Sequence, residues 1–119
     1  MDKKTIGNAG ETVACNFLIK KGYLIERRNF RLTMGEIDII AVDENGCYVF
    51  VEVKTRKNSN YGYAYEFVDY KKQDRIRKTA LVYCGGERYM RFDIIEVYYS
   101  IENNRMIIND INHIEDAFF

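Results

Sequence analysis

The chain has 119 residues, of which 47% are hydrophobic, 14% aromatic and 30% charged. This composition excludes disordered and fibrous proteins, and the length predicts a single domain over residues 1–119. The longest apolar runs are far shorter than the ~20 residues that a membrane-spanning helix needs, and no apolar segment typical of a secretory signal follows the basic N-terminus. We therefore expect a cytoplasmic protein that does not enter a membrane.

The charges balance overall, with 18 Lys and Arg against 18 Asp and Glu, but they are unevenly distributed. Residues 71–78 contain five bases and one acid, whereas the chain from residue 93 onward has six acids and one base. The whole chain is therefore not a general polyanion binder, although its basic segment can hold a polyanion locally.

Helical spacing of apolar residues predicts a first helix over residues 9–21. Asn8 is the expected N-cap of this helix, and Gly22 is the expected stop signal. The next segment, residues 23–30, is bounded by Gly22 and by a polar stretch, which predicts a twisted edge strand.

A β-hairpin is predicted next. Its two arms, residues 37–42 and 47–55, are rich in β-branched side chains. The sequence Asp-Glu-Asn-Gly at residues 43–46 separates them and is typical of the turn in an antiparallel hairpin.

The second half of the chain predicts one more helix and further strands. We expect a loop over residues 57–66, a helix over 71–84, a strand over 90–99, a short strand over 105–109 and a tail over 114–119 that docks its aromatic side chains. The predicted fold class is α/β, with an α-β-β-β-α-β order and a mixed sheet flanked by helices.

Acidic side chains in the predicted hairpin point to a catalytic site. Glu52 and Lys54 are two residues apart in a strand, so their side chains project from the same face. Asp38 lies in the other arm, where an unpaired carboxylate is costly to bury, and the hairpin brings it next to Glu52. Carboxylates bind Mg²⁺, and a lysine can position a water and offset charge on phosphorus. On spacing alone, a buried Asp38–Lys54 pair that closes the hairpin is an equal alternative.

The order of these residues resembles a known nuclease signature. Asp38 followed by Glu52-Val53-Lys54 is similar to the PD-(D/E)xK signature of restriction-endonuclease-like folds, with Ile37 where the signature has proline. More closely, GEIDIIA at residues 35–41 followed by VFVEVKTR at 49–56 resembles the YraN-like family of small bacterial nuclease-fold proteins. Weaker matches extend the resemblance over nearly the whole chain, at Gly10-Glu11, Gly22-Tyr23, Arg91-Phe92-Asp93 and HIEDAF at residues 113–118.

The resemblance implies one PD-(D/E)xK nuclease-like domain with a restriction-endonuclease-like core. The family's fold is also similar to that of archaeal Holliday junction resolvases. The resemblance therefore implies a metal-dependent, structure-selective DNA endonuclease that acts on branched DNA, and it is compatible with a homodimer.

Individual site residues follow from the same resemblance. Asp38 and Glu52 would be ligands of Mg²⁺ or Mn²⁺, the backbone carbonyl of Val53 a further ligand, and Lys54 the catalytic lysine. Glu11 matches a glutamate in the first helix that adds a carboxylate to the metal site of resolvase-like nucleases.

Glu11 has a second interpretation. The spacing from Asn8 to Glu11 also fits a capping box, in which Glu11 bonds back to the Asn8 backbone. Glu11 shares a helical face with Ala14 and Leu18, however, which directs it toward the sheet. We expect the catalytic role.

Basic residues are the expected contacts for nucleic acid. Lys72 and Arg75 resemble basic residues that the family keeps at the start of the second helix, and Lys72 could reach the scissile phosphate. Arg75 and Lys78 could contact the strand backbone, and Arg28 is a further candidate. The alternative for this helix is a solvated basic face.

Other chemistries lack their residues. His113 is the only histidine, the three cysteines lack zinc spacing, and the glycines form no phosphate-binding loop. The sequence therefore predicts the endonuclease described above. The alternatives are a non-catalytic nucleic-acid-binding module and a protein-interaction module that docks through its acidic tail and Phe118-Phe119.

Overall fold

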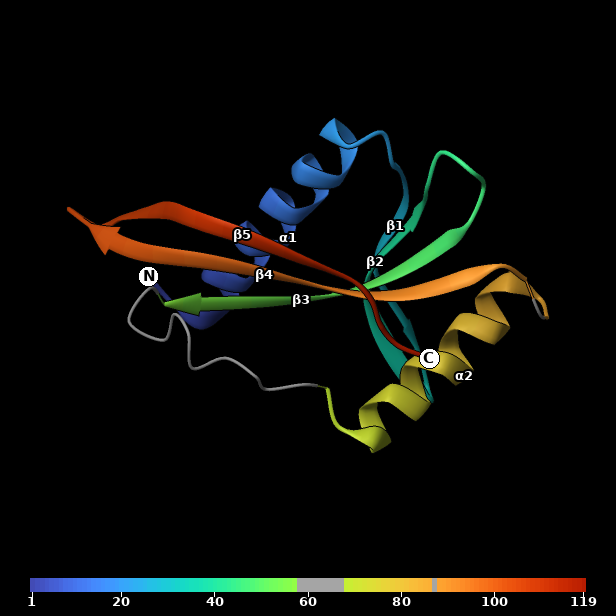
Figure 1. Cartoon of the computed structure of the whole chain (residues 1–119). Helices are drawn as coiled ribbons and strands as arrows, with labels where there is room; N and C mark the ends of the chain where they lie inside the picture. Colours follow the sequence, from blue (N-terminus) through green and yellow to red (C-terminus); the bar gives the residue numbers. More distant parts are fainter. Residues whose placement is uncertain (58–67, 87) are drawn as a thin grey trace.

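The structure, a computed structural model, describes residues 1–57, 68–86 and 88–119 (Figure 1). Within these residues the chain forms two helices and five strands. Their bounds are α1 Lys3–Lys20, β1 Leu24–Leu32, β2 Gly35–Val42, β3 Tyr48–Lys57, α2 Tyr70–Cys84, β4 Met90–Glu102 and β5 Arg105–Phe118. The predicted α/β class with a mixed sheet and an α-β-β-β-α-β order is confirmed, and β5 follows as a further full strand.

All five strands belong to one sheet in the order β1-β2-β3-β4-β5. Neighbouring strands are antiparallel except β3 and β4, which are parallel. Parallel neighbours need a crossover connection, and α2 forms part of that crossover. Figure 1 shows that α1 covers one face of the sheet and α2 covers the other.

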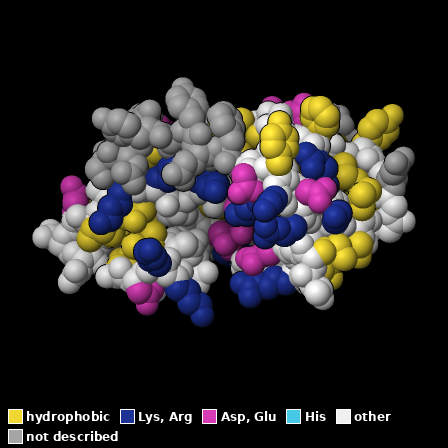
Figure 2. Space-filling model, turned by 90° about the horizontal axis from the view of Figure 1, so that it is seen from below, with side chains coloured by type: hydrophobic (Ala, Val, Ile, Leu, Met, Phe, Trp, Pro, Cys, Tyr) yellow, Lys and Arg dark blue, Asp and Glu magenta, His cyan; other side chains and the backbone are white. Residues whose placement is uncertain are grey.

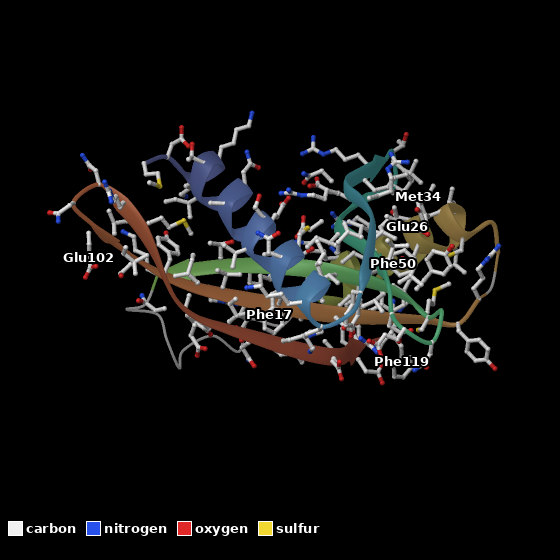
Figure 3. All side chains as sticks on the ribbon, turned by 90° about the horizontal axis from the view of Figure 1, so that it is seen from above. Phe17, Glu26, Met34, Phe50, Glu102 and Phe119 are labelled. Carbon is white, nitrogen blue, oxygen red and sulfur yellow. The ribbon has the colours of Figure 1, made fainter. Side chains whose placement is uncertain are left out.

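The sheet therefore has two separate apolar cores, one under each helix. Successive side chains of β3 alternate between them, so that Val51 packs under α1 and Phe50 packs under α2. Phe17 of α1 and Phe50, both labelled in Figure 3, belong to different cores. Ala14, Leu18, Ile39, Val51 and Ile95 are members of the first core, and Ile40, Phe50, Ile76, Ala80 and Phe92 are members of the second.

The first helix begins earlier than the sequence predicted. Its N-cap is Asp2, whose Oδ1 accepts a hydrogen bond of 2.8 Å from the N–H of Thr5. Asn8 therefore lies inside the helix, and the predicted cap at Asn8 is wrong, as is its capping box with Glu11. The predicted stop is confirmed, since Gly22 follows the helix with a φ of +94°.

The central hairpin is confirmed. Ile39 pairs with Val51 across the antiparallel ladder between β2 and β3. In the turn, the Asp43 carboxylate accepts hydrogen bonds of 2.9 Å from the N–H groups of Asn45 and Cys47. The edge strand predicted over residues 23–30 is also confirmed, as β1.

The last strand is longer than predicted. It pairs with β4 over almost its whole length, and the ring of Phe118 stacks on Phe92 at a centroid distance of 5.3 Å. The tail therefore docks Phe118, whereas Phe119 beside it is 87% exposed. The predicted loop begins at Lys57, which ends β3, and its residues 58–66 lie outside the described residues. No helix within residues 1–57, 68–86 and 88–119 has the length and hydropathy to span a membrane.

The two terminal phenylalanines allow a matched test of this docking. Phe118→Ala removes a ring that is 8% exposed and stacked in the α2 core, so we expect it to lower the free energy of unfolding by roughly 3 kcal/mol. Phe119→Ala removes an exposed ring and should leave stability unchanged. Urea denaturation followed by circular dichroism measures both, and equal effects of the two substitutions would contradict the β5 register.

Candidate active site

Asp38 of β2 and Glu52 of β3 face each other where these two strands stop pairing. The ladder between the strands ends at Ile39 and Val51. Beyond that point the Asp38 side chain takes the place of a backbone partner, because its Oδ2 accepts a hydrogen bond of 2.8 Å from the N–H of Val53. The predicted proximity of Asp38 and Glu52 is therefore confirmed.

The two carboxyl groups share a partly buried position. Burial raises the pKa of Asp38 to about 8, and the charge of Glu52 and its hydrogen bonding with Asp38 act in the same direction. Asp38 therefore holds its proton more tightly than an exposed aspartate does. A cation bound between the two groups would remove this penalty and let both ionise.

Lys72 of α2 already supplies positive charge to this pair. Its Nζ lies 2.5 Å from Glu52 Oε1, and Glu52 is only 8% exposed. Although burial alone would lower the pKa of Lys72, its hydrogen bond to Glu52 and the charges of Glu52 and Asp38 raise it. The helix start that positions Lys72 is capped by Asp69, whose Oδ1 accepts a hydrogen bond of 2.8 Å from the Lys72 N–H.

Glu11 of α1 contributes a third carboxyl group to this region. Burial raises its pKa, the Asn29 side chain and Arg28 oppose the shift, and the charges of Glu36 and Glu52 add to it. Its Oε1 is buried and has no hydrogen-bond partner among the described residues, since Arg28 Nη2 is 3.8 Å away. The second interpretation of Glu11, as part of a capping box, is excluded by the helix start at Lys3.

Two glycines bring both helices close to the site. A Cβ at Gly10 would lie 2.1 Å from Thr55 Oγ1, so α1 packs against β3 only with glycine there. A Cβ at Gly35 would lie 2.8 Å from Thr79 Oγ1 and 3.0 Å from the carbonyl oxygen of Arg75, so α2 packs closely against β2. Glu11 and Glu36 directly follow these glycines in the sequence. The close packing thus brings Glu11 of α1 next to the hairpin, whereas Glu36 belongs to its arm β2.

A cleft of about 440 Å³ opens above the acid pair, between the β1–β2 turn and the start of α2. Its lining includes Asp38, Glu52, Glu36, Lys72, Arg75 and Arg31. Figure 2 looks onto the face occupied by α2 and shows acidic side chains in a hollow with Lys and Arg side chains around them. Negative charge at the base and positive charge at the rim suit a cation below and a phosphate group above.

Comparison with known proteins identifies the family. The pattern described as "Uncharacterised protein family UPF0102" matches residues 10–97. The chain belongs to the UPF0102 family. A UPF0102 protein of Caldanaerobacter subterraneus subsp. tengcongensis is 46% identical over 122 residues, which cover 99% of this chain and 98% of that relative. UPF0102 proteins of Caldicellulosiruptor bescii and of a Clostridium botulinum strain are 46% and 44% identical, covering 99% and 92% of this chain and 100% and 93% of those relatives.

In this UPF0102 protein Lys54 lies on β3, half-buried and in register with Glu96 of β4. Within the described residues it does not form the Asp38–Lys54 pair that the spacing allowed. The partners of the Asp38 carboxyl group are instead the Val53 N–H and Glu52. Lys54 thus keeps its predicted place on the strand beside Glu52, and its catalytic role stays a prediction.

The four predicted nucleic-acid contacts lie in different places relative to the cleft. Lys72 and Arg75 line the cleft, and Arg28 lies beside Glu11 and donates a hydrogen bond of 3.2 Å to Thr12 Oγ1. Lys78 instead pairs with Asp74 on the exposed side of α2, at 3.0 Å. The face of α2 that carries Lys72 and Arg75 therefore belongs to the site, whereas Lys78 lies on a solvated face.

Sequence reasoning missed Glu96, a buried acid on the same sheet face as Lys54. Its carboxylate accepts hydrogen bonds from Asn112 Nδ2 at 2.9 Å and Tyr98 Oη at 3.1 Å, and Arg56 Nε lies 3.4 Å away. The signal was available, because Glu96 interrupts an apolar run as Asp38 does. Its oxygens are engaged by these neighbours, so this acid supports the sheet beside Lys54.

Several of the remaining motif residues of the resemblance meet on the face of the sheet that α1 covers, where Asp93 pairs with Val51 and His113 contacts Phe17. Asp93 is fully buried and accepts hydrogen bonds of 2.9 Å from two nitrogens of Arg91, while His113 Nε2 lies 2.7 Å from it. Arg91 also donates to Tyr23 Oη at 2.6 Å. This network joins the end of α1 to β4 and β5, and it braces the fold away from the cleft.

The acid pair fits a divalent cation. Mg²⁺ keeps several water ligands in proteins and is commonly held by one or two carboxylates. Asp38 and Glu52 supply two, and the carbonyl of Val53 is a predicted further ligand. Glu11, whose Oε1 has no hydrogen-bond partner among the described residues, is an additional candidate but does not line the cleft. No three His, Cys, Asp or Glu side chains of the described ranges form a complete metal-binding group. The fit therefore depends on the Asp38–Glu52 pair.

The raised pKa of Asp38 predicts an unusual dependence of stability on pH. The folded chain holds this proton more tightly than the unfolded chain, so the free energy of unfolding should fall as pH rises from about 4 to about 8. Asp38→Asn removes the ionisation and should be more stable than the wild type at pH 8, by on the order of a few kcal/mol, in EDTA.

Urea denaturation at pH 5 and pH 8 measures this difference. Glu36→Gln is the matched control, because Glu36 lines the same cleft but pairs with Arg31 at 3.2 Å. We expect Asp38→Asn, but not Glu36→Gln, to reduce the change in unfolding free energy between pH 5 and pH 8. If both variants keep the wild-type change, the raised pKa of Asp38 is contradicted.

Proposed function

We propose that this protein is a DNA endonuclease that depends on Mg²⁺ or Mn²⁺ and selects branched or otherwise non-duplex DNA. The observation that carries the proposal is the Asp38–Glu52 pair at the base of a cleft with basic residues on its rim. The resemblance to PD-(D/E)xK nucleases supports the same activity. The proposal includes a cytoplasmic location, where bacterial DNA is found.

Phosphodiester hydrolysis forms a bond between a water oxygen and phosphorus, breaks one P–O bond, and moves a proton from the water to the leaving oxygen. Asp38 and Glu52 would hold the divalent cation, with the Val53 carbonyl and Glu11 as further ligands. When bound, the cation would stabilise the negative charge of the phosphorane-like transition state and lower the pKa of a bound water. Lys54 would position the attacking water from the neighbouring place on β3.

Basic side chains at the cleft would bind the DNA backbone. Arg75 and Arg31 line opposite walls, on α2 and at the end of β1, so a phosphate group entering the cleft can contact both. These contacts recognise phosphate and carry no base sequence. Among the described residues, the basic side chains of the cleft suit phosphate, which favours selection by DNA shape over selection by sequence.

A homodimer belongs to this proposal as well. A junction has two strands to cut, and the described part of one copy of the chain holds a single Asp38–Glu52 pair. Two copies would present two such pairs to one branched substrate.

A second function is favoured by one specific contact. Lys72 contacts Glu52 directly, so an ammonium can balance the charge of this carboxylate. A non-catalytic module that binds branched DNA through Lys72, Arg75 and Arg28 would need no more than this. Such a module would bind DNA without a divalent cation and would not cut it.

A cleavage assay separates the two functions. The purified protein is incubated with end-labelled duplex, single-stranded, flap and four-way-junction DNA, with Mg²⁺, Mn²⁺ or EDTA. We expect cutting of branched DNA only with a divalent cation, and a loss of at least about 100-fold in Asp38→Ala, since the acid pair holds the cation. Glu36→Gln is the matched control and should cut.

Cleavage that persists in purified Asp38→Ala would overturn the nuclease proposal. Junction binding in EDTA without cutting under any condition, weakened by Arg75→Ala, would instead establish the binding module.

A further inference from the structure

We propose that Lys72 is a built-in counter-cation of the acid pair, which holds Glu52 in the metal-free protein and leaves it when a divalent cation binds. This inference rests on the proposed function, because it concerns the same carboxylates. It assigns Lys72 a step before DNA cleavage, in addition to any contact with phosphate.

The two partners of this ion pair differ in their freedom to move. Glu52 lies in the middle of β3, and its side chain is 8% exposed. The Lys72 side chain is 44% exposed and reaches the pair from the first turn of α2. The Asp69 cap fixes the Lys72 backbone, so that only its flexible side chain has to turn away from Glu52.

The ammonium and a divalent cation compete for one carboxylate. Lys72 Nζ is in direct contact with Glu52 Oε1 at 2.5 Å. The charge of Asp38 also favours the ammonium form of Lys72. Two positive ions that both touch this small partly buried pair would repel each other strongly. Binding of one therefore excludes the other from Glu52.

The released ammonium remains in the cleft. Lys72, Arg75 and Ile76 line the same wall of α2, and Arg31 lines the opposite side. A phosphate oxygen is the group in a nucleic acid that an ammonium can contact there. Cation binding thus adds one cationic side chain to the phosphate-binding set, which couples metal binding to DNA binding.

Two other base–acid pairs among the described residues differ from this arrangement. Arg28 is 3.8 Å from the buried Oε1 of Glu11, a distance too long for a hydrogen bond. Lys78 and Asp74 form an equally simple pair on the same helix, but both side chains are more than half exposed. Lys78→Met is therefore the matched control: it makes the same substitution as Lys72→Met, on the same helix, but outside the site.

The first test measures Mn²⁺ affinity by electron paramagnetic resonance of the free ion, in the absence of DNA. We expect Lys72→Met to bind Mn²⁺ about tenfold more tightly than the wild type, because no ammonium has to be displaced. Lys78→Met should bind as the wild type does. Because the Lys72 side chain is partly exposed, we expect both variants to fold. Thermal unfolding and circular dichroism verify this.

The second test follows the ammonium itself. The ¹⁵Nζ resonance of Lys72, identified by its absence in Lys72→Arg, should shift when Mg²⁺ is added to the wild type and should not shift in Asp38→Ala. The Lys78 resonance should stay in place in both proteins.

The outcomes separate this inference from the proposed function. The displacement of Lys72 would be overturned if the wild type binds Mn²⁺ but Lys72→Met and Lys78→Met have equal affinities. It would also be overturned if the Lys72 resonance does not move when the cation binds. Either result would leave the nuclease proposal standing. Absence of Mn²⁺ binding in the wild type and in Lys72→Met would overturn both.

Discussion

The carboxyl groups of Asp38 and Glu52 are held together where β2 and β3 separate. The electrostatics of the rest of the site depend on this close approach. The ladder stops at Ile39 and Val51, and the Asp38 carboxylate caps the free N–H of Val53. Burial and the charge of Glu52 then raise the pKa of Asp38 to about 8. Lys72 relieves part of the cost by its contact with Glu52. A divalent cation is the ion best able to relieve the rest, because it lets both carboxyl groups ionise.

The remainder of the fold keeps this unfavourable pair in place. Gly10 and Gly35 allow each helix to approach one arm of the hairpin, and separate apolar cores under α1 and α2 hold the helices there. On the α1 face of the sheet, the buried Asp93 with Arg91 and His113 joins β4 and β5 to the end of α1. The polar network thus supports the fold on the α1 face, whereas the acid pair and its cleft lie on the α2 face.

The sequence was most informative where the structure depends on neighbours in the chain. The hairpin was predictable because β-branched arms flank a turn sequence, and its register brings Asp38 to Glu52. The contact between Lys72 and Glu52 was not predictable, because it depends on how the crossover places α2 over the sheet. The length of β5 was missed because its pairing with β4 overrides the polar residues Asn109, Asp110 and Asn112, which weaken a strand pattern. At α1, Asp2 and Asn8 are both competent caps, and the helix starts at the earlier one, where Asp2 accepts a hydrogen bond from the Thr5 N–H.

We propose that the Asp38–Glu52 pair is a cation site, and anomalous X-ray diffraction from crystals grown with Mn²⁺ tests this most directly. We predict an anomalous peak between the two carboxylates, with Lys72 Nζ no longer in contact with Glu52. A structure at millimolar Mn²⁺ in which the pair holds no ion and Lys72 still contacts Glu52 would contradict this account.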